Sequence, residues 1–331
     1  MVAVLLALLF LCGCRAPADG GAKTPAAPGM APGTHTLFVT VKGVARSYLL
    51  HLPPSYDPAR AWPVVVMFHG GGGNAREAMR DTGWAEKADA EGFLAVFPEG
   101  TPPDPSRPAQ FRGNPQTWND GSQRANLGAA QRAVPDVEFV AALLADLKAR
   151  CRVDSQRIYA TGFSNGASMT FRVARELSRF FAAAAPVAGA DWLESQTPER
   201  PVPLLYITGT ADPLNPIDGG PIRIGLRELG RKPPTRQMIA AWAKMAGCAE
   251  EPRVVYDRDG ARGVAYGAPG DTNRVVLYTI EGHGHHWPGQ KSSLPEFLAG
   301  KNTAKLDATG VIWEFFKAHD LRGSPAKEAK P

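Results

Sequence analysis

A serine lies between two glycines in Gly162-Phe163-Ser164-Asn165-Gly166, after a strand-like run and before a helix-compatible run. This G-x-S-x-G pattern is typical of a sharp strand-to-helix turn, where small neighbours leave room for a serine held in a strained backbone conformation. A serine hydroxyl is a weak nucleophile, so it needs a base and a carboxylate that orients the base. The motif predicts Ser164 as a nucleophile; the alternative is a helix-capping serine in a glycine-rich turn.

The carboxylate is expected after the serine, because the chain order in hydrolases with this turn is serine, acid, histidine. Asp212 follows a predicted buried strand in Thr208-Gly209-Thr210-Ala211-Asp212-Pro213, where a loop can reach the serine. Asp218, six residues on, is its rival. An Asx turn before Pro213 is the other role open to Asp212.

The base is expected in residues 282–288, which read G-H-G-H-H-W-P and follow another predicted strand. Three of the chain's seven histidines lie here, and spacing alone does not decide among His283, His285 and His286. A metal site is the competing idea, but no nearby acidic or cysteine ligand completes it, so we expect no metal. Structural roles are expected for the other four histidines, His35, His51, His69 and His319.

Two backbone N–H groups must be fixed before negative charge develops on the substrate oxygen. Asn165, directly after the nucleophile, is expected to supply one. The second is expected from the glycine run 69–74, which follows a strand ending at Phe68, with Gly71 the preferred donor. The same glycines resemble a phosphate cradle, but no Lys-Ser/Thr follows, so a P-loop is rejected.

The elements that must position these residues alternate between strand-like and helical patterns, which indicates an α/β fold with a mainly parallel sheet. A hairpin split at Lys42-Gly43 opens the domain. Strands are predicted at 36–41, 44–52, 63–68, 93–97, 157–161, 204–209 and 275–280. Two helices are predicted at about 76–90 and about 307–319. A third is predicted to begin at an N-cap, Asp136, because apolar residues recur at helical spacing after it, at Val137, Val140, Ala141 and Leu144.

More than thirty residues between Pro98 and Val134 lack such patterns and are rich in Pro, Gly, Asn, Gln and Arg. Loops of this length are usually functional or disordered. This one follows a strand, so it should emerge at the sheet edge where α/β proteins bind ligands. It carries Trp118-Asn119-Asp120.

Composition excludes several classes of protein. Hydrophobic residues make up 44% and charged residues 21%, so the chain as a whole is neither disordered, collagenous nor coiled coil. The net charge is +5 and no block of five Lys or Arg occurs, so no nucleic-acid partner is expected. Cys151 and Cys248 are compatible with a disulfide, but sequence does not show whether they meet.

The N-terminus reads as a targeting segment. Residues 2–11 are almost wholly apolar but too short to span a bilayer, as in a signal peptide. Leu11-Cys12-Gly13-Cys14 resembles a bacterial lipobox, in which Cys14 would be lipidated; a plain secretory signal or a misplaced start codon is the alternative. We divide the chain into a signal (1–14), an Ala/Pro/Gly-rich linker (15–33), a catalytic domain (34–321) and a polar tail (322–331). Membrane contact is expected only through the lipid.

Four segments together resemble the polyhydroxybutyrate depolymerase and feruloyl esterase family of the α/β-hydrolases. They are residues 69–74, 159–167, 212–216 and 284–289, and the likeness runs from about Thr36 to Leu321. The resemblance implies an α/β-hydrolase fold, a mostly parallel sheet flanked by helices. Its G-H-x-W-P-G motif implies that His285 is the base. Its W-N-D motif implies that Trp118-Asn119-Asp120 helps to shape the substrate site.

The expected function is therefore a secreted or lipid-anchored serine carboxylic-ester hydrolase that uses no cofactor. Trp118 and Trp287 could flank the acyl group with aromatic faces, which favours hydroxycinnamoyl esters of plant polysaccharides; the alternative is that both only pack. The chain ends soon after its last predicted helix, so a separate domain for binding crystalline polymer is not expected. The remaining alternatives are a depolymerase of polyhydroxybutyrate or its oligomers, a serine peptidase, and a non-catalytic polymer-binding lipoprotein.

Overall fold

The computed structural model describes residues 29–122, 124–193, 195–224, 227–248, 251–268, 274–292 and 294–322. The predicted signal with Cys14, most of the linker and nearly all of the tail lie outside these residues. Within the described ranges, no helix has both the length and the apolar character needed to cross a membrane.

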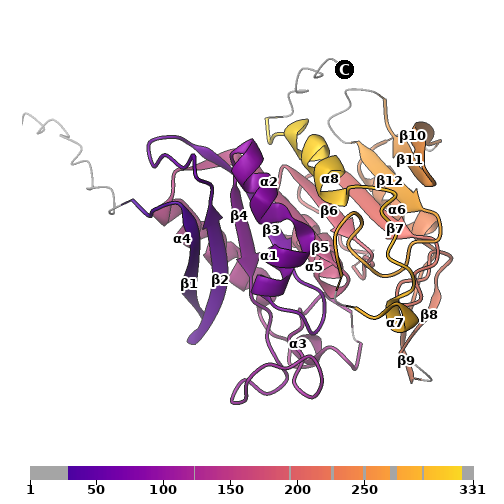
Figure 1. Cartoon of the computed structure of the whole chain (residues 1–331), viewed down its shortest axis with the longest axis horizontal. Coiled ribbons are helices and arrows are strands. Elements are labelled where there is room, and N and C mark those ends of the chain that lie inside the picture. Colours follow the sequence, from indigo (N-terminus) through magenta and orange to yellow (C-terminus); the bar gives the residue numbers. More distant parts are fainter. Residues whose placement is uncertain are drawn as a thin grey trace, which may run out of the picture.

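A ten-stranded sheet in the order β1-β2-β4-β3-β5-β6-β7-β12-β11-β10 forms the centre of the molecule (Figure 1). The six strands from β4 to β12 in this order pair in parallel, whereas β1, β2, β11 and β10 are antiparallel at the two edges. The strands are β1 (Gly33–Val41), β2 (Val44–Leu52), β3 (Trp62–Phe68), β4 (Leu94–Pro98), β5 (Val153–Phe163), β6 (Ala183–Val187), β7 (Leu204–Gly209), β10 (Arg253–Arg258), β11 (Ala261–Tyr266) and β12 (Val275–Ile280). The prediction of a mainly parallel α/β sheet is confirmed.

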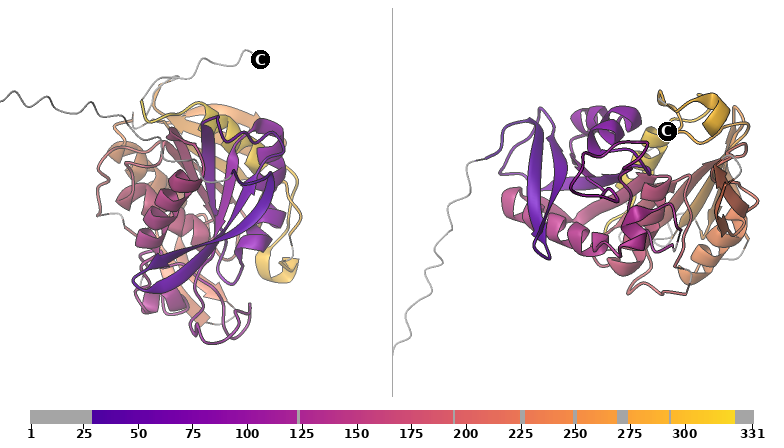
Figure 2. Two further views of the ribbon diagram at one scale, coloured as in Figure 1. Left: turned by 90° about the vertical axis from the view of Figure 1, so that its left-hand side faces the viewer. Right: turned by 90° about the horizontal axis from the view of Figure 1, so that it is seen from below.

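Helices cover both faces of this sheet (Figures 1 and 2). Along β3, Val65 and Met67 pack under α1, α2 and α8, while Val64 and Val66 pack under α4 and α5 on the other face. The continuous apolar run of β3 is thus explained by burial on both sides. The helices are α1 (Ala75–Thr82), α2 (Trp84–Glu91), α3 (Gly128–Gln131), α4 (Asp136–Arg150), α5 (Asn165–Glu176), α6 (Thr235–Met245), α7 (Glu296–Ala299) and α8 (Ala308–Lys317).

Two predicted helices differ from the structure. The single helix expected at 76–90 is two helices, because Gly83 takes a left-handed conformation (φ 69°) between α1 and α2. The helix expected to be capped by Asp136 starts there, but the N-cap position is Pro135 and Asp136 makes no cap bond. Its carboxylate instead pairs with Arg46 (2.8 Å) inside the protein.

Several elements were not predicted: β6, α6, β10, β11 and a separate hairpin of β8 (Gly220–Ile224) and β9 (Arg227–Lys232). In its described residues, the long loop after β4 holds only α3 and two isolated bridges, Thr101 to Thr117 and Gln110 to Asn114. This loop, the β8–β9 hairpin and α7 lie at the same end of the molecule, at the bottom of Figure 1. Cys151 and Cys248 are not joined by a disulfide.

Candidate active site

Ser164 lies at the turn from β5 to α5 with φ 56° and ψ −118°, a left-handed backbone that few non-glycine residues adopt. Glycine is required at the surrounding positions because there is no room for a side chain. A Cβ at Gly162 would overlap the Gly166 carbonyl, a Cβ at Gly166 would overlap the Phe68 carbonyl, and a Cβ at Gly189 would overlap the Ser164 carbonyl. Three close backbone contacts therefore hold the strained turn and present the half-buried serine at the carboxyl end of β5.

The side chains of Ser164, His285 and Asp212 form one hydrogen-bonded chain. Ser164 Oγ lies 2.8 Å from His285 Nε2, and His285 Nδ1 lies 2.8 Å from Asp212 Oδ2. The N–H groups of Leu214 and Asn215 donate to Asp212 Oδ1 at 2.9 and 2.8 Å, which leaves Oδ2 facing the imidazole. With the carboxylate as acceptor, the imidazole proton is on Nδ1 and Nε2 can accept from the serine hydroxyl.

Adjacent parallel strands bring the loops of Asp212 and His285 together. Asp212 follows β7 and His285 follows β12, which pair in register so that Gly209 lies opposite Ile280. The pairing continues past the strands, because Ala211 N–H donates to the His283 carbonyl at 3.0 Å. The rival acid, Asp218, is exposed and belongs to a different part of this loop.

The other two histidines of the cluster support the loop. Thr303 N–H donates to His283 Nδ1 (3.1 Å), so His283 Nε2 donates to the His286 carbonyl (3.2 Å). Burial lowers the pKa of His283, which favours the neutral ring. His286 Nε2 donates to the Gly300 carbonyl at 2.8 Å. Of the three histidines, His285 is the one that contacts both Ser164 and Asp212. Across the described ranges, no group of three or more His, Cys, Asp or Glu side chains is arranged to bind a metal ion.

The glycine loop after β3 packs against the serine turn. A Cβ at Gly70 would lie 3.5 Å from Ser164 Cβ, and one at Gly71 would lie 3.6 Å from Asn165 Cβ. Among the residues that the structure describes, no protein group accepts a hydrogen bond from the N–H of Gly71 or of Asn165. The two predicted donors are therefore brought to the same side of the turn.

His69 fixes the start of this loop. Gly100 N–H donates to His69 Nε2 (2.9 Å), so Nδ1–H donates to the Gly70 carbonyl (2.7 Å). Burial lowers the pKa of His69 to about 4, so the ring is neutral at physiological pH. This agrees with the structural role expected for it.

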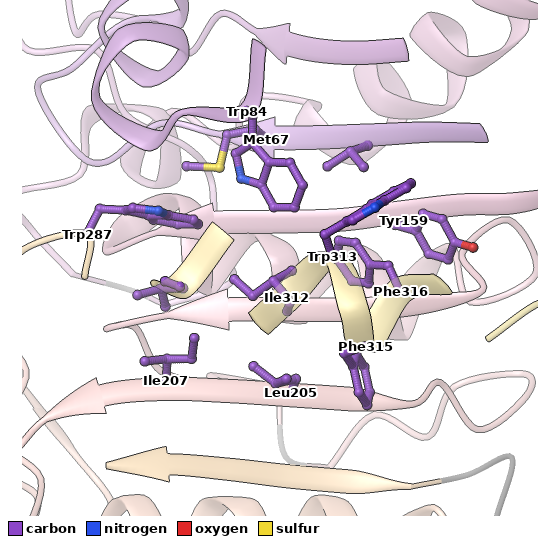
Figure 3. Close-up of a cluster of buried hydrophobic side chains, with 14 of the residues drawn as sticks. Met67, Trp84, Tyr159, Leu205, Ile207, Trp287, Ile312, Trp313, Phe315 and Phe316 are labelled. Atoms are coloured by element: carbon purple, nitrogen blue, oxygen red, sulfur yellow. The ribbon is translucent and has the colours of Figure 1, made fainter. Parts of the chain in front are cut away.

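Trp118 and Trp287, which were expected to flank the acyl group of the substrate, are both buried in the structure. Trp118 is fully buried, and its indole N–H donates to the His69 carbonyl at 2.9 Å. Trp287 is 4% exposed, donates to Thr309 Oγ1 at 2.9 Å, and packs in the apolar cluster beneath α8 (Figure 3). Both tryptophans therefore pack inside the protein, because their rings are buried and their indole N–H groups donate to protein acceptors.

A different aromatic residue lies at the surface against the glycine loop. Phe111, in the long loop, is 56% exposed and its ring packs directly on Gly72. Phe163, next to Ser164 in sequence, tilts against the His285 ring with centroids 4.8 Å apart. Sequence reasoning missed Phe111 because the loop pattern does not show which aromatic ring is buried.

Lys232, at the end of β9, is a second residue that sequence reasoning missed. Its ammonium donates to the Pro216 carbonyl (3.1 Å) and to Thr235 Oγ1 (3.0 Å), and it is 4% exposed. Burial lowers its pKa to about 8, while the nearby Asp212 carboxylate acts in the opposite direction. Lys232 thus holds the loop that carries Asp212, and no local sequence signal marks it.

A family model described as esterase PHB depolymerase matches residues 46–221. The chain belongs to this family. The NocK protein of Nocardia uniformis subsp. tsuyamanensis is 33% identical over 302 residues, which is 84% of this chain and 80% of that protein. Membership of this esterase family supports hydrolysis of carboxylic esters as the activity of the chain.

Several other relatives of this chain are named feruloyl esterases or probable feruloyl esterases. Feruloyl esterase D of Neurospora crassa is 24% identical over 95% of this chain and 94% of its own length. Feruloyl esterase B of Piromyces equi is 27% identical over 72% of this chain, which spans 42% of that longer protein.

Solved structures show the same fold. An acetyl xylan esterase from Aspergillus awamori superposes with a TM-score of 0.54 at 15% identity, over 77% of this chain and 94% of that one. A thermostable esterase superposes with a TM-score of 0.54 at 16% identity, over 87% of this chain and 63% of that one. The predicted α/β-hydrolase fold is confirmed.

Proposed function

We propose that this esterase-family chain hydrolyses carboxylic esters through a triad of Ser164, His285 and Asp212. The observation that supports it is the continuous path from Ser164 Oγ through the imidazole to Asp212, with both contacts at 2.8 Å. The exposed Gly71 and the free Asn165 N–H beside the serine add the two donors that an oxyanion requires.

In this mechanism Ser164 Oγ attacks the ester carbonyl carbon while His285 Nε2 takes the hydroxyl proton. Asp212 stabilises the resulting imidazolium, and the N–H groups of Gly71 and Asn165 stabilise the oxyanion. The tetrahedral intermediate collapses when His285 returns the proton to the leaving alcohol. Water then attacks the acyl-serine with His285 as base, which releases the carboxylic acid and restores the serine.

The first experiment compares wild-type protein with Ser164→Ala on a p-nitrophenyl ester. The variant should fold and lose nearly all activity, because the three side chains act as a unit. An active Ser164→Ala protein would contradict the triad. A wild-type protein that binds polymer but hydrolyses no ester or peptide would favour the non-catalytic lipoprotein.

For the substrate we propose an ester of a hydroxycinnamic acid on a plant polysaccharide. The relatives named feruloyl esterases support this class. So does the half-exposed ring of Phe111 against the glycine loop, where it can meet a flat acyl group. The family description favours one second candidate, an ester of 3-hydroxybutyrate oligomers.

The two substrates are separated by kcat/KM for methyl ferulate and for a short hydroxybutyrate oligomer. We expect the ferulate to be preferred, and Phe111→Ala to reduce that preference. Phe38→Ala is the matched control, since Phe38 is also exposed (61%) but lies on the edge strand β1. Faster cleavage of the oligomer with no ferulate released would support the depolymerase.

We also propose export with a lipid anchor at Cys14, which rests on the N-terminal sequence alone. More than one acyl chain is needed for stable attachment, and a lipoprotein cysteine supplies them. Cys14→Ser should move the protein out of the membrane fraction without changing its esterase activity. A wild-type protein found wholly in the soluble fraction would contradict the anchor.

A further inference from the structure

The side chain of Asn165 is held by a segment far away in sequence. Its Oδ1 accepts the Trp118 N–H at 2.7 Å, and its Nδ2 donates to the Trp118 carbonyl (3.2 Å) and to Asp120 Oδ2 (2.8 Å). Asn165 is 5% exposed, so water does not compete for these bonds. The residue that offers its backbone N–H at the serine is thus fixed through its side chain by the long loop.

Trp118 reaches the second donor as well. Its indole N–H donates to the carbonyl of His69, two residues before Gly71, at 2.9 Å. The ring packs edge-on against Phe68 (centroids 5.3 Å apart) and against His69 (4.9 Å). One tryptophan therefore connects the serine turn, through its main chain, with the glycine loop, through its side chain.

The segment that holds Asn165 is itself attached to the body of the fold. The N–H of Asn119 donates to Asp136 Oδ2 at 2.8 Å, and Asp136 forms a buried ion pair with Arg46 of β2. Asp120 also accepts from Arg124 at 2.5 Å. These contacts give the Trp118–Asp120 segment a fixed position on the sheet rather than the freedom of an ordinary loop.

We propose that Trp118 and Asp120 are positioning residues that set the separation of the two oxyanion donors, Gly71 and Asn165. This rests on the proposed function. The physical reason is that donors stabilise a developing oxyanion best when they are placed before the reaction, so that no reorganisation is needed. A displacement of about 1 Å can lower a rate on the order of a hundredfold.

The test compares Trp118→Phe with the matched control Trp62→Phe. Both tryptophans are fully buried, and both donate an indole N–H to a main-chain carbonyl, Trp62 to Asp57 at 2.8 Å. Trp62 lies at the start of β3, the end opposite to the glycine loop. The two substitutions therefore remove the same kind of hydrogen bond and a similar ring volume. Only Trp118, however, lies between the two oxyanion donors.

Three readouts separate positioning from general stability: kcat and KM on p-nitrophenyl acetate, the inhibition constant of an alkyl trifluoromethyl ketone, and the thermal midpoint. The ketone adds to Ser164 Oγ, His285 takes the proton, and the former carbonyl oxygen becomes an anion in the same hole. For Trp118→Phe we expect kcat to fall on the order of tenfold or more at nearly constant KM, with ketone affinity falling by a similar factor. Trp62→Phe should lower the midpoint and leave both kcat and ketone affinity within about twofold of wild type.

Asn165→Ala keeps the backbone N–H but frees it from Trp118 and Asp120, so it should show the same paired loss. It also serves as a second arm if Trp118→Phe does not fold. Wild-type kcat in either folded variant, a kcat loss without a loss of ketone affinity, or an equal loss in Trp62→Phe would overturn the proposal. Failure of the triad itself is distinguished beforehand, because Ser164→Ala would then remain active.

Discussion

Replacing Asp212 by Asn should disable His285 without removing it. In the native site the N–H groups of Leu214 and Asn215 both donate to Asp212 Oδ1, while Oδ2 faces His285 Nδ1. An asparagine would keep its carbonyl oxygen toward the two backbone donors. Its NH2 group would then face Nδ1, which must become an acceptor, and the imidazole proton would move to Nε2 opposite Ser164.

An imidazole with its proton on Nε2 cannot take the serine proton. A tautomer error of this kind lowers kcat by about 10⁴, which corresponds to about 5.5 kcal/mol of transition-state stabilisation. The fold should survive, because the two bonds from the backbone donors remain and the side-chain volume is unchanged.

The assay measures kcat on p-nitrophenyl acetate for wild type, Asp212→Asn and Asp218→Asn, with thermal midpoints for all three. Asp218 is the control, since it is exposed and lies in the same loop, and its variant should stay within about twofold of wild type. The reasoning is refuted if Asp212→Asn keeps more than a tenth of the wild-type kcat, or if Asp218→Asn loses as much.

Three further outcomes are expected. Gly166→Ala should give insoluble or strongly destabilised protein in a solubility and melting assay, because its Cβ would overlap the Phe68 carbonyl. For Lys232, the folded-state pKa of about 8 lies below the usual 10.5, so the unfolded chain binds more protons between these values. The free energy of unfolding should therefore rise with pH across that window, by up to about 3 kcal/mol relative to Lys232→Met in urea melts. Chelation by EDTA should not change the esterase rate; a loss restored by zinc would reassign the cluster of His283, His285 and His286 to a metal site.

The serine and its turn could be predicted because their determinants are local. Gly162 and Gly166 lie within two residues of Ser164, and the space they leave is needed by any sequence that makes this turn. The base was harder. Three histidines share one loop, and their spacing does not choose among them. The G-H-x-W-P-G resemblance implied His285, and the structure places that imidazole against Asp212.

Strand β6 escaped prediction because its sequence, Ala-Ala-Ala-Pro-Val, has weak strand propensity. It is nevertheless fully buried between β5 and β7, where small side chains let helices approach both faces. The break at Gly83 was missed for a related reason. A glycine inside a helical pattern is tolerated in many helices, and only the backbone geometry shows that this one ends α1.

The long loop shows most clearly where local patterns stop being informative. Trp118 reaches Asn165 and His69 across 47 and 49 residues, and nothing near it in sequence indicates whether its ring faces the substrate or the core. Phe111 and Trp118 share this loop but differ in burial, one 56% exposed and the other fully buried. If the buried Trp118 sets the oxyanion donors and the exposed Phe111 meets the acyl group, substitutions at these two residues must have different effects. Phe111→Ala should change the ranking of ester substrates and leave trifluoromethyl ketone affinity nearly unchanged. Trp118→Phe should slow all esters by a similar factor, because every ester passes through the same oxyanion; a change of ranking by Trp118→Phe would contradict this division of roles.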